Sequence, residues 1–342
     1  MRCGFTSRWG LSPATKASSS AWTRHRTAQR KREMSKIGFI GLGTMGGSFA
    51  RNVQKAGHDL VVHDLHRQFA QPHLDAGATW ADSPRALAAN CDVVLTSLPG
   101  PPEVTAVATE LSTGLKPGSA VFDLSTNAPA VVRQLHADFA KRGLHFLDAP
   151  VSGGPKGALS GRCAIWVGGD RAVFDQHRKV LDAMGDQVRY IGPIGAGSIA
   201  KLVHNAAGYA IQCALAEVFS VGAKAGVEPL ALFEAVRQGA RGRVRTFDML
   251  ADQFLVNHYD PPSFALRLAH KDVSLAVQLG QEVGVPMRMI NLALQELTEA
   301  RGRGWDHRDS RSAMLLQLER AGIEFHESPQ AVRAVLDSDG AA

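Results

Sequence analysis

The chain has 342 residues, 45 % of them hydrophobic, which is ordinary for a globular protein and enough for roughly two domains. Its net charge of +6 arises in residues 1–33, where eight Lys and Arg residues face one acid, and the remaining chain holds 30 basic against 31 acidic residues. This distribution excludes a basic nucleic-acid-binding domain, so we expect no nucleic-acid partner. No run of about 18 uninterrupted apolar residues occurs, and we predict no membrane span.

Residues 1–35 form a Ser-, Thr- and Arg-rich leader without apolar periodicity, and we expect it to be poorly ordered. Two interpretations stay open. The composition suits a transit peptide that would direct the protein to the mitochondrial matrix. Alternatively, Met34 is the true initiator and the protein is cytoplasmic, which we favour because the leader shows no convincing amphipathic helix. The four cysteines are Cys3, Cys91, Cys163 and Cys213. They form no CxxC pair, which indicates a reducing compartment.

From Lys36 onward, short apolar runs alternate with longer helical stretches. Strands are predicted at 37–40, 60–64, 93–99, 120–125, 145–151, 164–169 and 188–192, and helices at 45–56, 66–76, 102–111 and 129–142. The strands are apolar throughout rather than alternating, which is typical of a parallel sheet covered on both faces. We therefore predict an α/β domain over 36–194, with a doubly wound, mostly parallel sheet.

After Gly197 the pattern becomes helical. Helices are predicted at 198–226, 228–239, 245–256, 263–284, 286–302 and 309–322. The first of them is longer than a typical globular helix, so we expect it to span the interface between two domains and to offer an apolar face to a second subunit. The pattern predicts an all-α domain over 195–325 and a loose tail over 326–342.

The stretch IGFIGLGTMGGSFA, residues 37–50, places Gly41, Gly43 and Gly46 between a predicted strand and a predicted helix. In a Rossmann-type turn, the first glycine permits the tight turn, the second lets a pyrophosphate approach, and the third allows close helix packing. The phosphates then lie at the helix N-terminus. The alternative is a glycine-rich turn without a ligand. We predict cofactor binding by Gly41, Leu42, Gly43, Thr44, Met45 and Gly46.

Asp64 ends the second predicted strand, 18 residues beyond Gly46, where an acid accepts hydrogen bonds from an adenosine ribose. The alternative is an acid that only caps the next helix. A carboxylate at this position would repel a 2′-phosphate, so we predict NAD as the cofactor rather than NADP. His66 and Arg67 lie nearby and soften this preference.

Lys201 and Asn205 lie four residues apart, on one face of the long predicted helix. A lysine in the first turn of a helix faces the positive end of the dipole, which is mildly unfavourable. Desolvation in a cleft would lower its pKa and let it exchange a proton with a substrate oxygen. The alternative is a solvated surface lysine. No cluster of ligating residues predicts a metal site.

Six separated motifs resemble the β-hydroxyacid dehydrogenases, a family that includes 3-hydroxyisobutyrate dehydrogenase and tartronate semialdehyde reductase and has 6-phosphogluconate dehydrogenase among its larger relatives. The motifs are FIGLGTMGGSFARNVQKAGH at 39–58, SLP at 97–99, DLST at 123–126, DAPVSGGPKGALSG at 148–161, GAGSIAKLVHN at 195–205 and LAHKDVSLA at 268–276. The resemblance implies a Rossmann-type domain and a helical domain, an NAD-dependent oxidoreductase, a small anionic β-hydroxyacid as substrate, and a homodimer or homotetramer.

By position, the resemblance implies that Lys201 is the catalytic acid and base. It implies that the substrate is bound by Ser125, Ser152, Gly153, Gly154 and Asn205. It also implies that the cofactor contacts Leu98, Pro99, Thr126 and Lys271 besides the glycine loop and Asp64. A Ser-Gly-Gly turn after an apolar strand is compatible with an anion cradle, although it is equally typical of a plain loop.

Three alternatives differ from this interpretation. Relatives that decarboxylate 6-phosphogluconate have an acid where this chain has Gly208, and imine reductases share the architecture but lack the lysine. The third alternative is a redox sensor that binds NAD without turnover. The presence of both Lys201 and the Ser152 turn argues against this alternative. Arg241, Arg243 and Arg245 form either a solvated loop or a grip for a second anionic group on the substrate.

Overall fold

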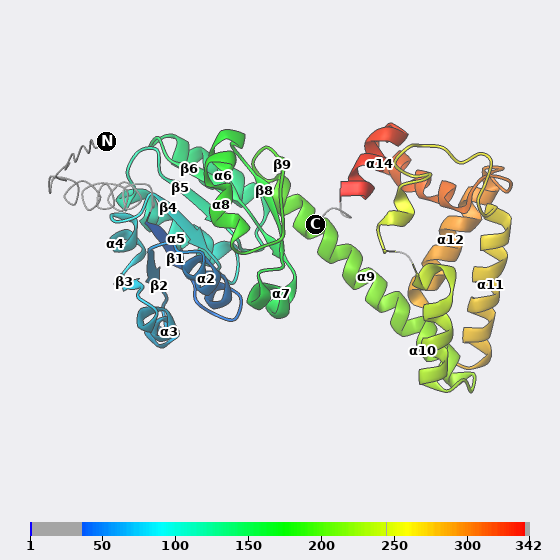
Figure 1. The fold of residues 1–342 in the computed structure, drawn as a ribbon. Coiled ribbons are helices and arrows are strands. Elements are labelled where there is room, and N and C mark those ends of the chain that lie inside the picture. The colour runs from blue at the N-terminus through cyan, green and yellow to red at the C-terminus, as the bar shows by residue number, and fades with distance from the viewer. Residues whose placement is uncertain (2–35, 244, 339–342) are drawn as a thin grey trace. The chain divides into compact units, whose positions relative to one another are not determined.

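The computed structural model describes Met1, residues 36–243 and residues 245–338 (Figure 1). The predicted leader, apart from Met1, lies outside the described residues. The chain divides into two compact units, residues 1–204 and 205–342. Helix α9 (Ala196–Lys224) begins in the first unit and ends in the second.

The first unit is built around one sheet. Its strands are β1 (Ile37–Ile40), β2 (Leu60–His63), β3 (Thr79–Trp80), β4 (Val93–Thr96), β5 (Ala120–Asp123), β6 (His145–Asp148), β7 (Val151–Ser152), β8 (Ala164–Gly168) and β9 (Gln187–Gly192). Its other elements are α2 (Gly46–Lys55), η1 (Arg67–Ala70), α3 (Gln71–Asp75), α4 (Pro84–Ala88), α5 (Pro101–Gly114), α6 (Pro129–Ala140), α7 (Gly154–Ser160) and α8 (Arg171–Asp182).

The described strands follow the order β3-β2-β1-β4-β5-β6-β8-β7, with β9 beside β8. Strands β1 to β6 pair in parallel, whereas β8 runs antiparallel to β6 and β7. The prediction of a doubly wound, mostly parallel sheet is confirmed. The order reverses between β1 and β4, and such a switch point is where open α/β sheets bind ligands.

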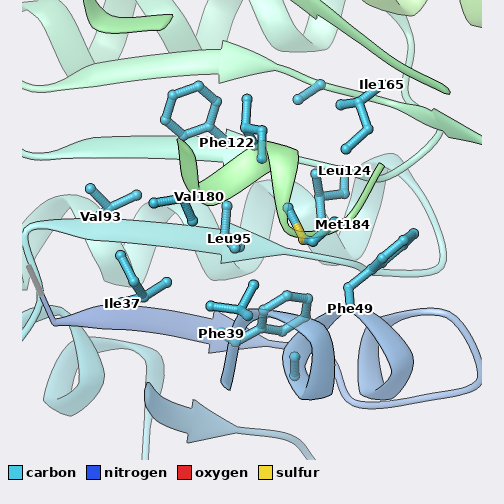
Figure 2. Packing of buried hydrophobic residues seen from close by; sticks show 14 of the residues in the cluster. Ile37, Phe39, Phe49, Val93, Leu95, Phe122, Leu124, Ile165, Val180 and Met184 are labelled. Atoms are coloured by element: carbon cyan, nitrogen blue, oxygen red, sulfur yellow. The ribbon is translucent and has the colours of Figure 1, made fainter. Parts of the chain in front are cut away.

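Successive residues of each central strand are buried on opposite faces of the sheet. Figure 2 shows Leu95 of β4 and Phe122 of β5 in one cluster with Phe49 of α2. Their chain neighbours Val94 and Val121 belong to a second cluster, which is covered by α4, α5 and α6. Because neither face meets water, the strands are apolar except at their ends.

The second unit is helical. It contains the end of α9, then α10 (Pro229–Gln238), η2 (Ala240–Gly242), η3 (Asp248–Leu250), α11 (Leu266–Glu282), α12 (Arg288–Gly302), η4 (Ser310–Met314), α13 (Leu315–Ala321) and α14 (Pro329–Ser338). Glu217 of α9 accepts hydrogen bonds from the backbone N–H groups of Met289 (2.8 Å) and Ile290 (3.2 Å), so its carboxylate lies at the N-terminus of α12, where negative charge is favourable. The prediction of an all-α second part is confirmed.

Several predicted elements differ from the structure, and the strand predicted at 145–151 divides into β6 and β7. Residues 66–76 form η1 and then α3, because Pro72 lacks the N–H that would continue one helix. Residues 245–256 contain the short turn η3 instead of a helix, with the N–H of Ala251 bonded three residues back to Asp248. Residues 309–322 divide into η4 and α13. Where a loose tail was predicted, α14 forms.

Candidate active site

Two glycines of the loop after β1 are required by the packing of the protein itself. Gly41 has a φ of +90°, and a side chain there would collide with the carbonyl oxygen of Ser97. A side chain on Gly46 would collide with the carbonyl oxygen of Gly41, so α2 could not begin so close to β1. Both glycines hold the loop against the segment after β4, whatever binds there.

Gly43 has a different role, because nothing in the protein requires a glycine at this position. It is exposed, its φ lies outside the left-handed region, and a Cβ added to it would meet no atom within 4 Å. A pyrophosphate that approaches the backbone explains the glycine. The first turn of α2 holds no acidic side chain to repel a phosphate. The loop therefore fits a dinucleotide, as the sequence predicts.

Asp64 joins the end of β2 to this loop. Its Oδ2 accepts a hydrogen bond from the backbone N–H of Leu42 (2.6 Å), and its Oδ1 accepts one from the backbone N–H of His66 (2.8 Å). The side chain of Leu42 is buried in the core, so only its backbone faces the loop. The carboxylate predicted to bind a ribose thus lies beside the glycine loop, and its hydrogen bond with Leu42 also stabilises that loop.

The segments after β4 and β5 are held together by Asp123, the first residue of the DLST motif, for which no role was predicted. Its side chain is 0 % exposed and accepts hydrogen bonds from Thr96 Oγ1 (2.9 Å) and Asn127 Nδ2 (3.1 Å). Burial raises the pKa of Asp123, and its hydrogen bonds oppose that rise. Pro99 and Thr126, both predicted to contact the cofactor, stay exposed on these segments.

Ser125 is buried, and its Oγ accepts a hydrogen bond from the backbone N–H of Leu98 (2.9 Å). Its own backbone N–H donates to Asp123 Oδ1 (3.1 Å). The structure therefore gives Ser125 a clear part in fixing the loop after β4. The contact with the substrate that the resemblance implies stays a prediction.

Lys201 lies on α9, which begins at Ala196, two residues earlier than predicted. Lys201 is therefore in the second turn rather than the first, and the helix dipole disfavours its charge less than the sequence suggested. Its side chain is half-buried, and burial lowers its pKa, an effect that the negative charge of an ionised Cys163 would oppose. Lys201 is therefore not the fully solvated surface lysine of the alternative interpretation.

The Ser-Gly-Gly turn lies in the same neighbourhood as Lys201. Ser152 ends β7, and Gly153 (φ +152°) and Gly154 (φ +60°) adopt backbone conformations that favour glycine. A Cβ on Gly153 would lie 2.7 Å from Cys163 Sγ. Cys163 and Lys201 also act on each other's pKa, so the predicted substrate turn and the predicted acid and base both have Cys163 as a neighbour.

Two predicted site residues belong to the second unit. Asn205 follows Lys201 by one helical turn on α9, so the two residues share a side of that helix. Lys271 is exposed on α11, with its Nζ 2.7 Å from Asp272 Oδ1. Its contact with the cofactor stays a prediction.

A switch point in the strand order, a glycine loop with room for a pyrophosphate and an acid at the ribose position define a dinucleotide-binding domain. Residues 36–192 match the family model described as the NAD binding domain of 6-phosphogluconate dehydrogenase. Residues 195–317 match the one described as NAD-binding of NADP-dependent 3-hydroxyisobutyrate dehydrogenase. The chain belongs to the β-hydroxyacid dehydrogenase family, and it is an NAD-binding, NAD(P)-dependent hydroxyacid dehydrogenase.

Relatives with named activities agree with this assignment. The chain is 31 % identical over 291 residues to 2-(hydroxymethyl)glutarate dehydrogenase of Eubacterium barkeri, covering 84 % of this chain and 96 % of that protein. It is 33 % identical over 284 residues to the NAD-dependent L-serine dehydrogenase of Pseudomonas aeruginosa, covering 81 % and 95 %. The structure of Mycobacterium tuberculosis 3-hydroxyisobutyrate dehydrogenase with L-serine matches with a TM-score of 0.59 at 27 % identity, over 83 % of this chain and 99 % of that one.

Imine reductases share the fold. That of Myxococcus stipitatus matches with a TM-score of 0.72 at 18 % identity, over 83 % of this chain and 98 % of that one. A likeness at this identity concerns the fold alone.

Proposed function

We propose that this dehydrogenase oxidises, or forms in reverse, the hydroxyl group of a small anionic β-hydroxyacid, with Lys201 as the general acid and base. Nicotinamide, when bound, supplies the hydride chemistry. The chain itself orients the substrate and moves one proton. The observation that carries the proposal is the half-buried amine of Lys201, with its lowered pKa, in the neighbourhood of the Ser152 turn.

The proton passes between the substrate hydroxyl and Lys201 Nζ. In the oxidation, the neutral amine accepts the hydroxyl proton, and in the reduction the ammonium group returns a proton to the carbonyl oxygen. Because burial lowers the pKa of Lys201, more of the amine is neutral near physiological pH than for a solvated lysine. The imine reductase alternative has no use for this lysine, which favours the dehydrogenase.

The proposed substrate class follows from the relatives and from the turn. The named substrates 2-(hydroxymethyl)glutarate, L-serine and 3-hydroxyisobutyrate share a primary hydroxyl on the carbon β to a carboxylate. We propose that Ser152, Gly153 and Gly154 hold that carboxylate. A second anionic group on the substrate would engage Arg241, Arg243 and Arg245, all of which are exposed.

A panel of acids tests the proposed activity. We expect NADH to form with at least one of 3-hydroxyisobutyrate, L-serine, glycerate and 2-(hydroxymethyl)glutarate, and NAD to support faster turnover than NADP because Asp64 repels a 2′-phosphate. The readout is NADH absorbance. Tight NADH binding without turnover on any acid would instead favour the redox sensor.

We also propose that a second copy of the chain covers α9. This helix meets the length and composition of a membrane span, which is weak support for one, and only 6 % of its apolar window is buried. Exposed apolar side chains continue from α9 onto α10, including Tyr209, Leu215, Leu230 and Phe233. Closed homo-oligomers commonly bury such faces.

Leu215→Asp tests this assembly, because a charge at a side chain 47 % exposed here would have to be buried between the copies. We expect light scattering to give two or four chain masses for the wild type and one for the variant. Ile191→Asp on β9, at a side chain 44 % exposed, is the matched control and should leave the assembly intact. A monomeric wild type would disprove the proposal.

For the location, we propose the cytoplasm, or the mitochondrial matrix if the leader is a transit peptide. A mouse relative, 32 % identical over 282 residues, is named as mitochondrial.

A further inference from the structure

Asp148 holds the beginning of the helix that carries Lys201. It ends β6, and its side chain is 1 % exposed. Its Oδ1 accepts a hydrogen bond from the backbone N–H of Gly195 (2.8 Å), and its Oδ2 accepts one from the backbone N–H of Ser198 (2.6 Å). Gly195 immediately precedes α9, and Ser198 lies in its first turn. A buried carboxylate is costly unless it is hydrogen-bonded, so these two donors stabilise it.

Glycines in the surrounding backbone allow the close contact between Asp148 and the start of α9. A side chain on Gly197 would collide with the carbonyl oxygen of Trp166 on β8. A Cβ on Gly168 would lie 2.5 Å from Asp148 Oδ1. These two glycines let the first turn of α9 lie directly against the ends of β6 and β8, within reach of the carboxylate.

The position of Lys201 depends on this anchor. Lys201 follows Ser198 by three residues, which is about one helical turn. Because the helix backbone is hydrogen-bonded over that turn, fixing the N–H of Ser198 also fixes the Cα of Lys201. Asp148 also precedes Ser152 by four residues, so the strand that ends in this anchor leads directly to the predicted substrate turn.

We propose that Asp148 is a positioning residue that acts on the reaction through Lys201, without touching substrate or cofactor. The proposal rests on the proposed function, in which Lys201 moves the proton. Asp123 supplies a contrast on the neighbouring strand β5. It pairs in register with Asp148 and is equally buried, but its carboxylate bonds to the segments predicted to bind the cofactor.

A double-mutant cycle tests the proposal. Asp148→Asn keeps the size of the side chain but presents an NH₂ group to one of the two N–H donors. In the wild-type background we expect kcat to fall by about 10- to 100-fold, with KM and the Kd for NADH changed less than about threefold. In the Lys201→Ala background we expect the same substitution to lower kcat less than about threefold, because the group that it positions is already absent.

Two controls separate this effect from general damage. Asp123→Asn should raise the Kd for NADH, in contrast to Asp148→Asn. Asp138→Asn removes an exposed carboxylate on α6, paired with Lys141 at 2.7 Å, and should leave kcat and Kd unchanged.

An equal loss of kcat in both backgrounds would overturn the proposal, because a merely structural role does not depend on Lys201. So would a wild-type kcat in Asp148→Asn. If Asp148→Asn does not fold, Ser198→Pro removes the second donor and leaves Asp148 in place, in the first helical turn where proline is tolerated, and the same non-additive loss is expected. Full turnover of Lys201→Ala would instead disprove the proposed function, so the two failures are distinguishable.

Discussion

Lys201→Ala is expected to lower kcat for hydroxyacid oxidation by on the order of 10² or more, since general acid–base catalysis contributes about 10²–10⁴ to such steps. The Kd for NADH should change little, because the glycine loop and Asp64 do not depend on this side chain. Steady-state kinetics with the most active acid of the panel, together with NADH fluorescence titration, measure both quantities.

Lys224→Ala is the matched control, because it removes an exposed lysine from the last turn of the same helix and should leave kcat unchanged. A near-normal kcat in Lys201→Ala would show that the proton moves through another group. A large rise in the Kd for NADH would show that Lys201 serves cofactor binding instead.

Gly43→Val should raise the Kd for NADH by on the order of tenfold or more with little change in Tm. The added side chain meets no protein atom near its Cβ, but it occupies the space predicted for the pyrophosphate. Losing one hydrogen bond to a charged phosphate costs about 1.5–3 kcal/mol, and every 1.4 kcal/mol is a factor of ten in Kd. Isothermal titration with NADH and thermal unfolding without it measure the two effects.

Gly46→Val gives the opposite pattern on the same loop. Its side chain would collide with the carbonyl oxygen of Gly41, so we expect a clear fall in Tm even without cofactor. If Gly43→Val bound NADH as tightly as the wild type, the pyrophosphate would lie elsewhere, and the assignment of this loop would be wrong.

The sequence predicted the central sheet well because its strands are buried on both faces and therefore apolar except at their ends. The pattern did not reveal β3, α4 or α7, which span two, five and seven residues and are too short to show a period. Helix α8 was also missed, although Asp170 at its start accepts a hydrogen bond from the N–H of Ala172 (2.8 Å) and marks an N-cap. This N-cap aspartate was the sequence signal from which the start of α8 could have been predicted.

The candidate site was predicted only where the chemistry is local in sequence. The glycine spacing, the acid after the second strand and the lysine with its asparagine are all visible over a few tens of residues. Asp123 and Asp148 begin two of the motifs, but their roles were not predicted, because these come from partners such as Thr96 and Ser198, which are 27 and 50 residues away in the chain. Only the register of the sheet and the start of α9 bring these groups together.

The pH dependence of kcat for oxidation, measured side by side for the wild type and Lys201→Ala, tests the central claim most directly. Because burial lowers the pKa of Lys201, the wild-type rate should rise with pH through a single ionisation below the usual lysine value of about 10.4, as the amine becomes neutral. The variant should lose this rise and stay slow at every pH. The same rise in the variant would contradict the account, because another group would then accept the proton.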